Sequence, residues 1–194
     1  KTDNYELCIR SRYYRWNAEL VGFFNESNNG TSFDQDLNIL TQPEEIYGIE
    51  ASVAVRPLDR LEVGGTISWI KGQVDADDDG TFEEDLPTTR IPPEKLTGYV
   101  DYQPLKRWRL RAQLLYSGTQ SNDSSAFGGG QEIEDYVVVD LYNTVSLGPG
   151  AIEIGVTNLF DNAYFPVVNQ AFNSQFANVR GPGRRVSLGY SFTY

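Results

Sequence analysis

The feature that most constrains the fold of this chain is an alternation of apolar and polar residues with a period of two. In one segment, Leu61, Val63 and Ile67 alternate with polar or small residues such as Glu62 and Thr66. Alternation of this kind is typical of a β-strand with one apolar and one polar face. Nine segments show it, at approximately 3–11, 15–24, 45–56, 61–72, 95–103, 108–118, 135–147, 151–165 and 183–194. The sequence therefore predicts an all-β, antiparallel fold of about nine strands, with helix limited to a turn or two in the loops.

The connections between the predicted strands are of two kinds, which alternate along the chain. Short turns are predicted at 12–14, 57–60, 104–107 and 148–150, and Pro, Gly and Asp in the last three supply turn geometry. Long polar loops are predicted at about 25–44, 73–94, 119–134 and 166–182. Short turns at one end and long loops at the other are typical of a transmembrane β-barrel. The strand lengths agree, because a tilted strand needs about 9–11 residues to cross a bilayer, whereas soluble strands commonly have about 5–6.

Aromatic residues gather near the ends of the predicted strands, among them Trp16, Trp69, Tyr102, Trp108 and Tyr116. This placement is similar to the aromatic girdles that lie at the two interfaces of a membrane. The alternative is a soluble β-sandwich or barrel in which the same rings line a core. The sorting of loops and the lengths of the predicted strands both favour the membrane barrel.

The composition argues against several functional classes. The chain has 16 Lys and Arg against 27 Asp and Glu, with a formal net charge of −11, which disfavours nucleic-acid binding because that needs a basic face. The absence of histidine removes Ser-His and Cys-His catalysis and His-ligated zinc. Cys8 has no partner in the chain for an internal disulfide. Neither enzymatic activity nor a resident cofactor is expected.

One acidic run invites a metal-binding interpretation. The residues DADDDG at 75–80 match the first six positions of an EF-hand loop. An EF-hand is excluded, because its twelfth position requires a bidentate Glu and is Leu86 here, and because the flanks are strands. Two interpretations remain, a solvated acidic loop or a looser cation site made by Asp75, Asp77, Asp79 and Glu83.

The C-terminal part of the chain resembles a known family. The run NLFDNAY at 158–164 is followed by RGPGR at 180–184 and by an alternating strand that ends on the aromatic Tyr194. This pattern resembles the end of the TonB-dependent outer-membrane receptors, and the siderophore receptors in particular. The runs YGIE at 47–50 and RIPP at 90–93 are similar to segments of the same receptors.

The resemblance implies an antiparallel transmembrane β-barrel of the type with about 22 strands, of which residues 1–194 would be the C-terminal segment. The plug domain and the N-terminal strands would then lie outside these residues. The implied function is TonB-coupled uptake of a ferric siderophore, or a similar scarce nutrient, at the outer membrane of a Gram-negative-type bacterium. The residues also allow two other functions: a small self-contained outer-membrane barrel acting as a passive pore or adhesin, and an outer-membrane hydrolase, which the absence of histidine disfavours.

Two sets of residues are candidates for function within this framework. Aromatic residues in the predicted outer loops are candidates for ligand contact, because no predicted core explains them; they are Phe33, Phe82, Phe127, Phe172 and Phe176. Alternating aromatics in the final strand are the expected signal for the barrel-assembly machinery, and they are Tyr190, Phe192 and Tyr194. The expected partners are therefore the ferric chelate, the TonB energy-coupling protein, the assembly machinery and outer-membrane lipid.

Overall fold

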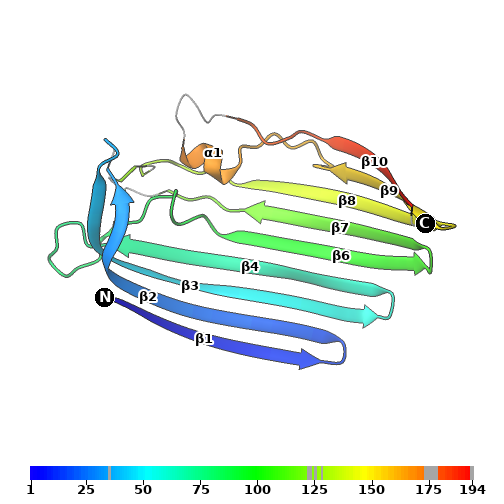
Figure 1. The fold of residues 1–194 in the computed structure, drawn as a ribbon, viewed down its shortest axis with the longest axis horizontal. Coiled ribbons are helices and arrows are strands. Elements are labelled where there is room, and N and C mark those ends of the chain that lie inside the picture. Colours follow the sequence, from blue (N-terminus) through cyan, green and yellow to red (C-terminus); the bar gives the residue numbers. More distant parts are fainter. Residues whose placement is uncertain (35, 122–123, 125, 128, 173–178, 193–194) are drawn as a thin grey trace.

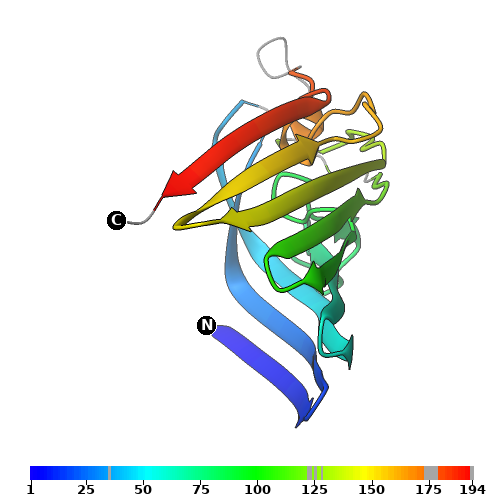
Figure 2. The ribbon, with the colours of Figure 1, turned by 90° about the vertical axis from the view of Figure 1, so that its right-hand side faces the viewer.

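Ten strands form one antiparallel sheet in the computed structural model of the chain (Figure 1). The structure describes residues 1–34, 36–121, 124, 126–127, 129–172 and 179–192. The strands are β1 (Thr2–Tyr13), β2 (Trp16–Phe33), β3 (Ile39–Leu58), β4 (Leu61–Val74), β5 (Glu84–Asp85), β6 (Lys95–Leu105), β7 (Trp108–Ser117), β8 (Tyr136–Leu147), β9 (Gly150–Thr157) and β10 (Arg185–Phe192). Apart from the two-residue β5, which pairs with β4, each strand is hydrogen-bonded to its neighbours in chain order. The sheet is strongly curved, and β1 and β10 are its two edges (Figure 2).

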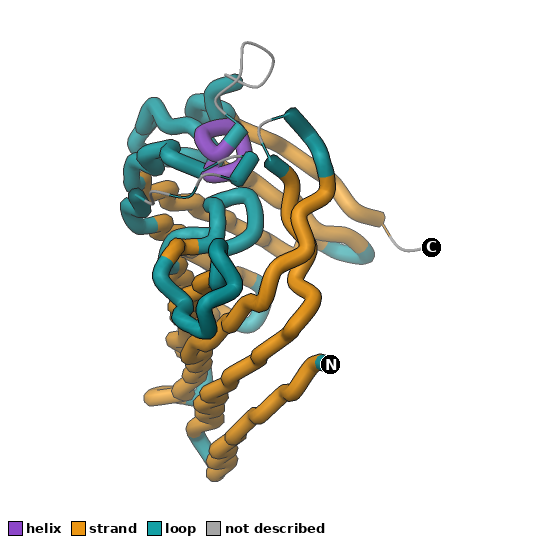
Figure 3. Tube along the Cα trace, turned by 90° about the vertical axis from the view of Figure 1, so that its left-hand side faces the viewer, coloured by secondary structure: helices purple, strands orange, loops and turns teal. Residues whose placement is uncertain are grey.

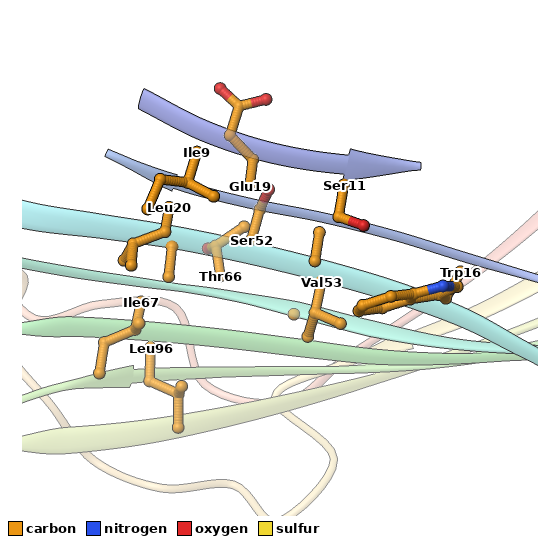
Figure 4. Close-up of a pocket in the computed structure, with 13 residues that line it drawn as sticks. Ile9, Ser11, Trp16, Glu19, Leu20, Ser52, Val53, Thr66, Ile67 and Leu96 are labelled. Carbon is orange, nitrogen blue, oxygen red and sulfur yellow. The ribbon is translucent and has the colours of Figure 1, made fainter. Parts of the chain in front are cut away.

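The strand register confirms the predicted two-faced sheet. Ile9 pairs with Leu20, Leu20 with Ala51, Ala51 with Ile67, and Ile67 with Leu96, so that apolar residues of five strands align on one face. We call this side the apolar face and the opposite side the polar face. Figure 4 shows Leu20, Ile67 and Leu96 pointing to the same side of the strands, whereas the Glu19 carboxylate points to the other.

The sorting of the connections is also as predicted. The four tight turns, at residues 14–15, 59–60, 106–107 and 148–149, lie at one end of the sheet, which we call the turn end (Figure 1). The long connections lie at the opposite end, which we call the loop end, and Figure 3 shows them gathered there.

Three predicted strand ends are wrong: two flank the predicted loop 25–44, and the third is the end of the predicted strand 151–165. The predicted loop 25–44 is mostly strand. It was missed because its polar residues show no alternation, but they pair regularly, and after a bulge between Ser27 and Gly30 the β2–β3 ladder continues to Phe33 opposite Ile39. The predicted strand 151–165 ends at Thr157 instead. Asn158 and Asp161 adopt left-handed backbone angles, with φ of 50° and 57°, which a strand cannot accommodate.

In the described part of the chain, helix is confined to one short element at the loop end, as predicted. The helix α1 (Val167–Ala171) has five residues. Among the described residues, no helix has the length and apolar character needed to span a membrane.

Candidate functional site

The connection between β4 and β6 folds back over the polar face at the loop end. Leu86 and Ile91 from this connection are 2% and 5% exposed and pack against Val74, with Ile46 and Ile70 beside them. The Leu86 N–H donates a hydrogen bond of 2.8 Å to the Gly72 carbonyl oxygen. A side chain at Gly72 would occupy this contact, because its Cβ would lie 2.7 Å from Leu86 Cδ1. Glycine at position 72 therefore lets the connection lie directly on the strand.

An ion pair on the same face holds this connection in place. Arg90 donates to both carboxylate oxygens of Glu44, at 2.5 and 3.0 Å, and their side chains are only 27% and 12% exposed. A two-point pair of this kind fixes orientation as well as distance. Gly30 makes room for the Glu44 carboxylate, since a Cβ at position 30 would lie 2.1 Å from its Oε2. The β2–β3 hairpin and the 84–93 segment are thereby joined.

Three of the five candidate phenylalanines come together at the loop end. The rings of Phe127 and Phe172 have centroids 5.9 Å apart, and the Phe127 N–H donates a 2.7 Å hydrogen bond to the Phe33 carbonyl oxygen. Thr89 Oγ1 donates to the Phe127 carbonyl oxygen at 3.2 Å. Phe82 is half-buried in the 75–83 stretch, and Phe176 lies outside the described residues. These contacts therefore join the end of β2 to two long connections that are far apart in the sequence, those containing Phe127 and Phe172.

A polar cleft lies between the ends of β4 and β7 and the 85–94 segment. Its lining includes Lys71, Asp85, Glu94 and Gln120. The side-chain oxygen of Gln120 is buried and accepts no hydrogen bond from the described part of the chain. A buried acceptor without a donor is costly, so this oxygen is suited to a donor from a ligand or from water.

The acidic run brings three of its four candidate ligands together. Asp75, Asp77 and Asp79 each offer an oxygen within 4.8 Å of the others, a spacing that could hold a metal ion. Glu83 is exposed and is not part of this group. Both oxygens of the buried Asp75 already accept backbone N–H groups, from Asp79 at 3.1 Å and from Gly80 at 2.8 Å. Asp75 therefore shapes the loop through its own hydrogen bonds.

Charged side chains on the polar face are paired across neighbouring strands. Arg10 donates to Glu19 at 2.7 Å, and Arg56 donates to Glu62 at 2.6 Å. Arg109 donates to Asp101 through both Nε and Nη2. Cys8 lies on this face, with its Sγ 3.9 Å from a Glu19 oxygen. Such a face suits a hydrated interior and would be costly against hydrocarbon.

The NLFDN run at 158–162 forms the first part of the connection from β9 to β10. Asn158 is 3% exposed; its amide group donates to the carbonyl oxygens of Asn162 and Pro182, and its oxygen accepts the Asn162 N–H. Asp161 accepts the Arg184 N–H at 2.7 Å. The left-handed backbone at Asn158 and Asp161 is thus stabilised by their own side chains.

The final-strand aromatics lie on the apolar face. Tyr190 pairs with Ile152 and Phe192 with Gly150, and their side chains are 60% and 56% exposed. Tyr194 lies outside the described residues.

The pKa values of two loop groups are shifted. Hydrogen bonds from the side chain and backbone of Asn38 and from the Asp36 N–H hold the pKa of Asp34 below its ordinary value. Burial raises the pKa of Tyr164, whose ring stacks on Tyr136 with centroids 4.7 Å apart. Both groups therefore keep their usual charge state near neutral pH.

Comparison with known proteins identifies the class of fold. The family described as TonB-dependent receptor-like β-barrel matches residues 1–159, and the chain belongs to this family. The "Rhizobactin receptor" of Rhizobium meliloti (strain 1021) is 22% identical over 173 residues, which cover 86% of this chain and 22% of that protein. The chain therefore spans about a fifth of the length of this relative.

Solved structures show the same fold. The "Copper transporter OprC" superposes with a TM-score of 0.80 at 18% identity, over 100% of this chain and 31% of that one. The ferric-catecholate import receptor Fiu from K12 E. coli superposes with a TM-score of 0.73 at 20% identity, over 97% of this chain and 27% of that one. The ten-stranded sheet is thus part of a TonB-dependent receptor type of β-barrel, and proteins of this family are receptors and transporters.

Sequence reasoning did not find several residues that shape the loop end. Glu44 and Arg90 are 46 positions apart, and neither lies in a pattern that predicts the other. Gly72 lies at the end of a predicted strand, where glycine is unremarkable without knowledge of what packs on it. Gln120 lies in a predicted polar loop. The RIPP run at 90–93 was the available signal, since it contains both Arg90 and Ile91.

Proposed function

We propose that this chain is the C-terminal part of the barrel wall of an outer-membrane receptor that takes up a ferric siderophore or a similar scarce nutrient. The apolar face contacts lipid, and the polar face encloses the barrel interior together with a plug domain that lies outside these residues. The loop end faces the outside of the cell, and the turn end faces the periplasm. The TonB energy-coupling protein acts through the part of the receptor outside this segment.

The observation that carries this proposal is the convergence of long connections at one end of a family β-barrel. The rings of Phe127 and Phe172 supply aromatic surface next to the end of β2 at Phe33. The neighbouring polar cleft holds the side-chain oxygen of Gln120, which accepts no hydrogen bond from the described residues. Ligand sites commonly combine apolar and aromatic surface with a few polar groups. The similarity to a rhizobactin receptor supports a siderophore as the ligand class.

Ligand binding by the full-length receptor tests the role of this end. We expect Phe127→Ala and Phe172→Ala each to weaken ferric-siderophore binding about tenfold, because a buried aromatic contact is worth about 1–2 kcal/mol. Phe24→Ala is the matched control, since Phe24 lies on the predicted lipid face opposite Tyr5. It should leave the affinity within about twofold of the wild type. Equal losses in all three variants would reject the loop end as the binding site.

The energy dependence of siderophore uptake distinguishes a receptor of this kind from a passive pore or an adhesin. Uptake of radiolabelled ferric siderophore should require both this receptor and TonB, and a protonophore should abolish it. Uptake that persists without TonB would indicate a passive pore. Binding to surfaces without any uptake would indicate an adhesin.

A further inference from the structure

The turn end carries a charge opposite to that of the chain as a whole. The three successive stretches 12–15, 56–60 and 104–109 contain seven of the 16 basic residues and one carboxylate, Asp59. The formal net charge of the whole chain is −11. The turn end is therefore a basic surface on an acidic protein.

Not all of these cations are neutralised. Arg56 pairs with Glu62, Arg109 with Asp101, and Arg15 with Asp59 at 2.8 Å. The other four, Arg12, Arg60, Lys106 and Arg107, are exposed, and within the described ranges no ion pair includes them. Four positive charges thus remain available to an outside partner, and three of them lie close together in the chain's fold.

Arg60 lies in the β3–β4 turn, and Lys106 and Arg107 form the β6–β7 turn. Figure 1 shows these two turns at the same end of the sheet. The β3–β4 and β6–β7 turns are side by side because Leu61 pairs with Tyr102. Arg60 Nη1 donates to the Pro104 carbonyl oxygen at 3.0 Å, and the Gln103 N–H donates to the Arg60 carbonyl oxygen at 2.8 Å. The guanidinium of Arg60 is therefore held toward the turn that carries Lys106 and Arg107.

Aromatic residues border this basic surface on the apolar face. Tyr102 and Trp108 flank the β6–β7 turn, and their side chains are 41% and 36% exposed. Trp108 Nε1 donates to Asn143 Oδ1 at 2.8 Å, which fixes the indole. Aromatic rings at the edge of the hydrocarbon, with Lys and Arg just beyond, match the level of lipid headgroups.

We propose that Arg60, Lys106 and Arg107 form a binding site for the phosphodiester headgroup of an anionic phospholipid in the leaflet at the turn end. The inference rests on the membrane placement in the proposed function. Arg supplies forked donors for phosphate oxygens, and Lys adds a point charge. An anionic lipid is favoured over a zwitterionic one because the surface has no unpaired carboxylate among its described residues to receive a headgroup amine.

Tryptophan quenching on the full-length receptor tests the site. The receptor in a neutral detergent is titrated with brominated phosphatidylglycerol or brominated phosphatidylcholine. The signal of Trp108 is the difference between the receptor and its Trp108→Phe variant. The site variant combines Arg60→Gln, Lys106→Gln and Arg107→Gln. The control variant combines Lys1→Gln, Lys95→Gln and Arg180→Gln, which removes the same charge at the loop end.

Selective quenching of Trp108 by phosphatidylglycerol is the expected result, and the site variant should weaken it by roughly fivefold per removed charge. The control variant should remain within about twofold of the wild type, and raising NaCl from about 0.05 to 0.5 M should weaken the quenching. Equal quenching by the two lipids, or equal losses in both variants, would overturn the proposal. Release of the lipid by millimolar inorganic phosphate would also overturn it, in favour of a free-phosphate site. Siderophore affinity measured on the same samples separates this result from the proposed function, because the basic turns lie at the end opposite the ligand loops.

Discussion

Arg90 and Glu44 meet across the polar face of the sheet, and their two-point ion pair fastens the β4–β6 connection to the β2–β3 hairpin. The pair joins residues 46 positions apart. Beside it, Leu86 and Ile91 pack on Val74, so that charge pairing and apolar burial act on the same segment. Val74, Leu86 and Ile91 are buried, whereas many large side chains of the apolar face, such as Leu20 and Ile67, are exposed.

Breaking this ion pair should release the segment without unfolding the barrel. Arg90→Ala leaves the Glu44 carboxylate partly buried and unpaired, and we expect the opening free energy of residues 84–94 to fall by about 1–3 kcal/mol. Hydrogen exchange of these amides, measured by mass spectrometry on the full-length receptor, gives this value. Lys71→Gln is the control, because the Lys71–Asp85 pair is longer, at 3.6 Å, and more exposed, and should contribute about 0–1 kcal/mol. Equal effects of the two changes would show that the pair does not fasten the segment.

A side chain at position 72 should disrupt the packing of the 84–94 segment on β4. Gly72→Val places a Cβ against Leu86 Cδ1 and Ile91 Cδ1, at 2.7 and 2.8 Å, and should displace the connection at a cost of about 1–3 kcal/mol. Gly22→Val is the matched change on the apolar face, where a Cβ meets nothing within 4 Å. Faster proteolysis within 84–94 is expected for the first variant alone. Identical cleavage of both would contradict the packing role of Gly72.

The side-chain amide of Asn158 should be required for the stability of the β9–β10 connection. Asn158→Asp removes the two donors that satisfy the carbonyl oxygens of Asn162 and Pro182, and it places a carboxylate beside them at a buried position. We expect a loss of about 2–3 kcal/mol in the stability of the β9–β10 connection. Asn4→Asp, at an exposed strand position, is the control. Hydrogen exchange across 158–184 reports the difference, and unchanged protection in Asn158→Asp would show that these bonds contribute little.

An added positive charge should destabilise the barrel more on the apolar face than on the polar face. Ile67→Arg places a cation on the apolar face and should cost about 2–4 kcal/mol if the residue lies near the middle of the bilayer. Thr66→Arg changes the neighbouring position on the polar face, where Thr66 meets Thr97 at 2.7 Å between hydroxyl oxygens. It should be milder, because that face is hydrated. Folding titrations of the receptor into lipid vesicles would measure both, and the reverse order would mean that the assignment of faces is inverted.

The sequence was sufficient for features that depend on neighbouring residues. The alternation around Ile67 predicts both the strand and its two faces, because side chains alternate at every residue of a strand. Alternation of residue type fails where small or polar residues such as Gly30 and Ser32 occupy the covered face, which explains why the ladder from Gly30 to Phe33 was predicted as loop. The end of β9 was missed because the left-handed backbone at Asn158 depends on hydrogen bonds to residues as distant as Pro182.

The candidate site was only partly predictable for the same reason. Loop aromatics were identified by residue type, and the structure joins Phe33, Phe127 and Phe172. Their association, like the pair of Glu44 and Arg90, is formed between segments far apart in the chain. No local pattern encodes such a contact.

The final strand provides a test of assembly that is separate from ligand binding. Tyr190 and Phe192 lie on the apolar face near the turn end, where an aromatic ring is favourable at the membrane interface. A barrel strand must also be paired on both sides, since open backbone groups in lipid cost several kcal/mol each. We expect Phe192→Ala combined with deletion of Tyr194 to reduce the amount of full-length receptor in the outer membrane, with unchanged siderophore affinity in the molecules that assemble. Heat-modifiability gels measure assembly, and ligand titration measures affinity. Val186→Ala is the control, because it removes an apolar side chain from the same face of the same strand but far from its C-terminal end. Normal assembly with weakened binding would place these aromatics in a ligand site instead.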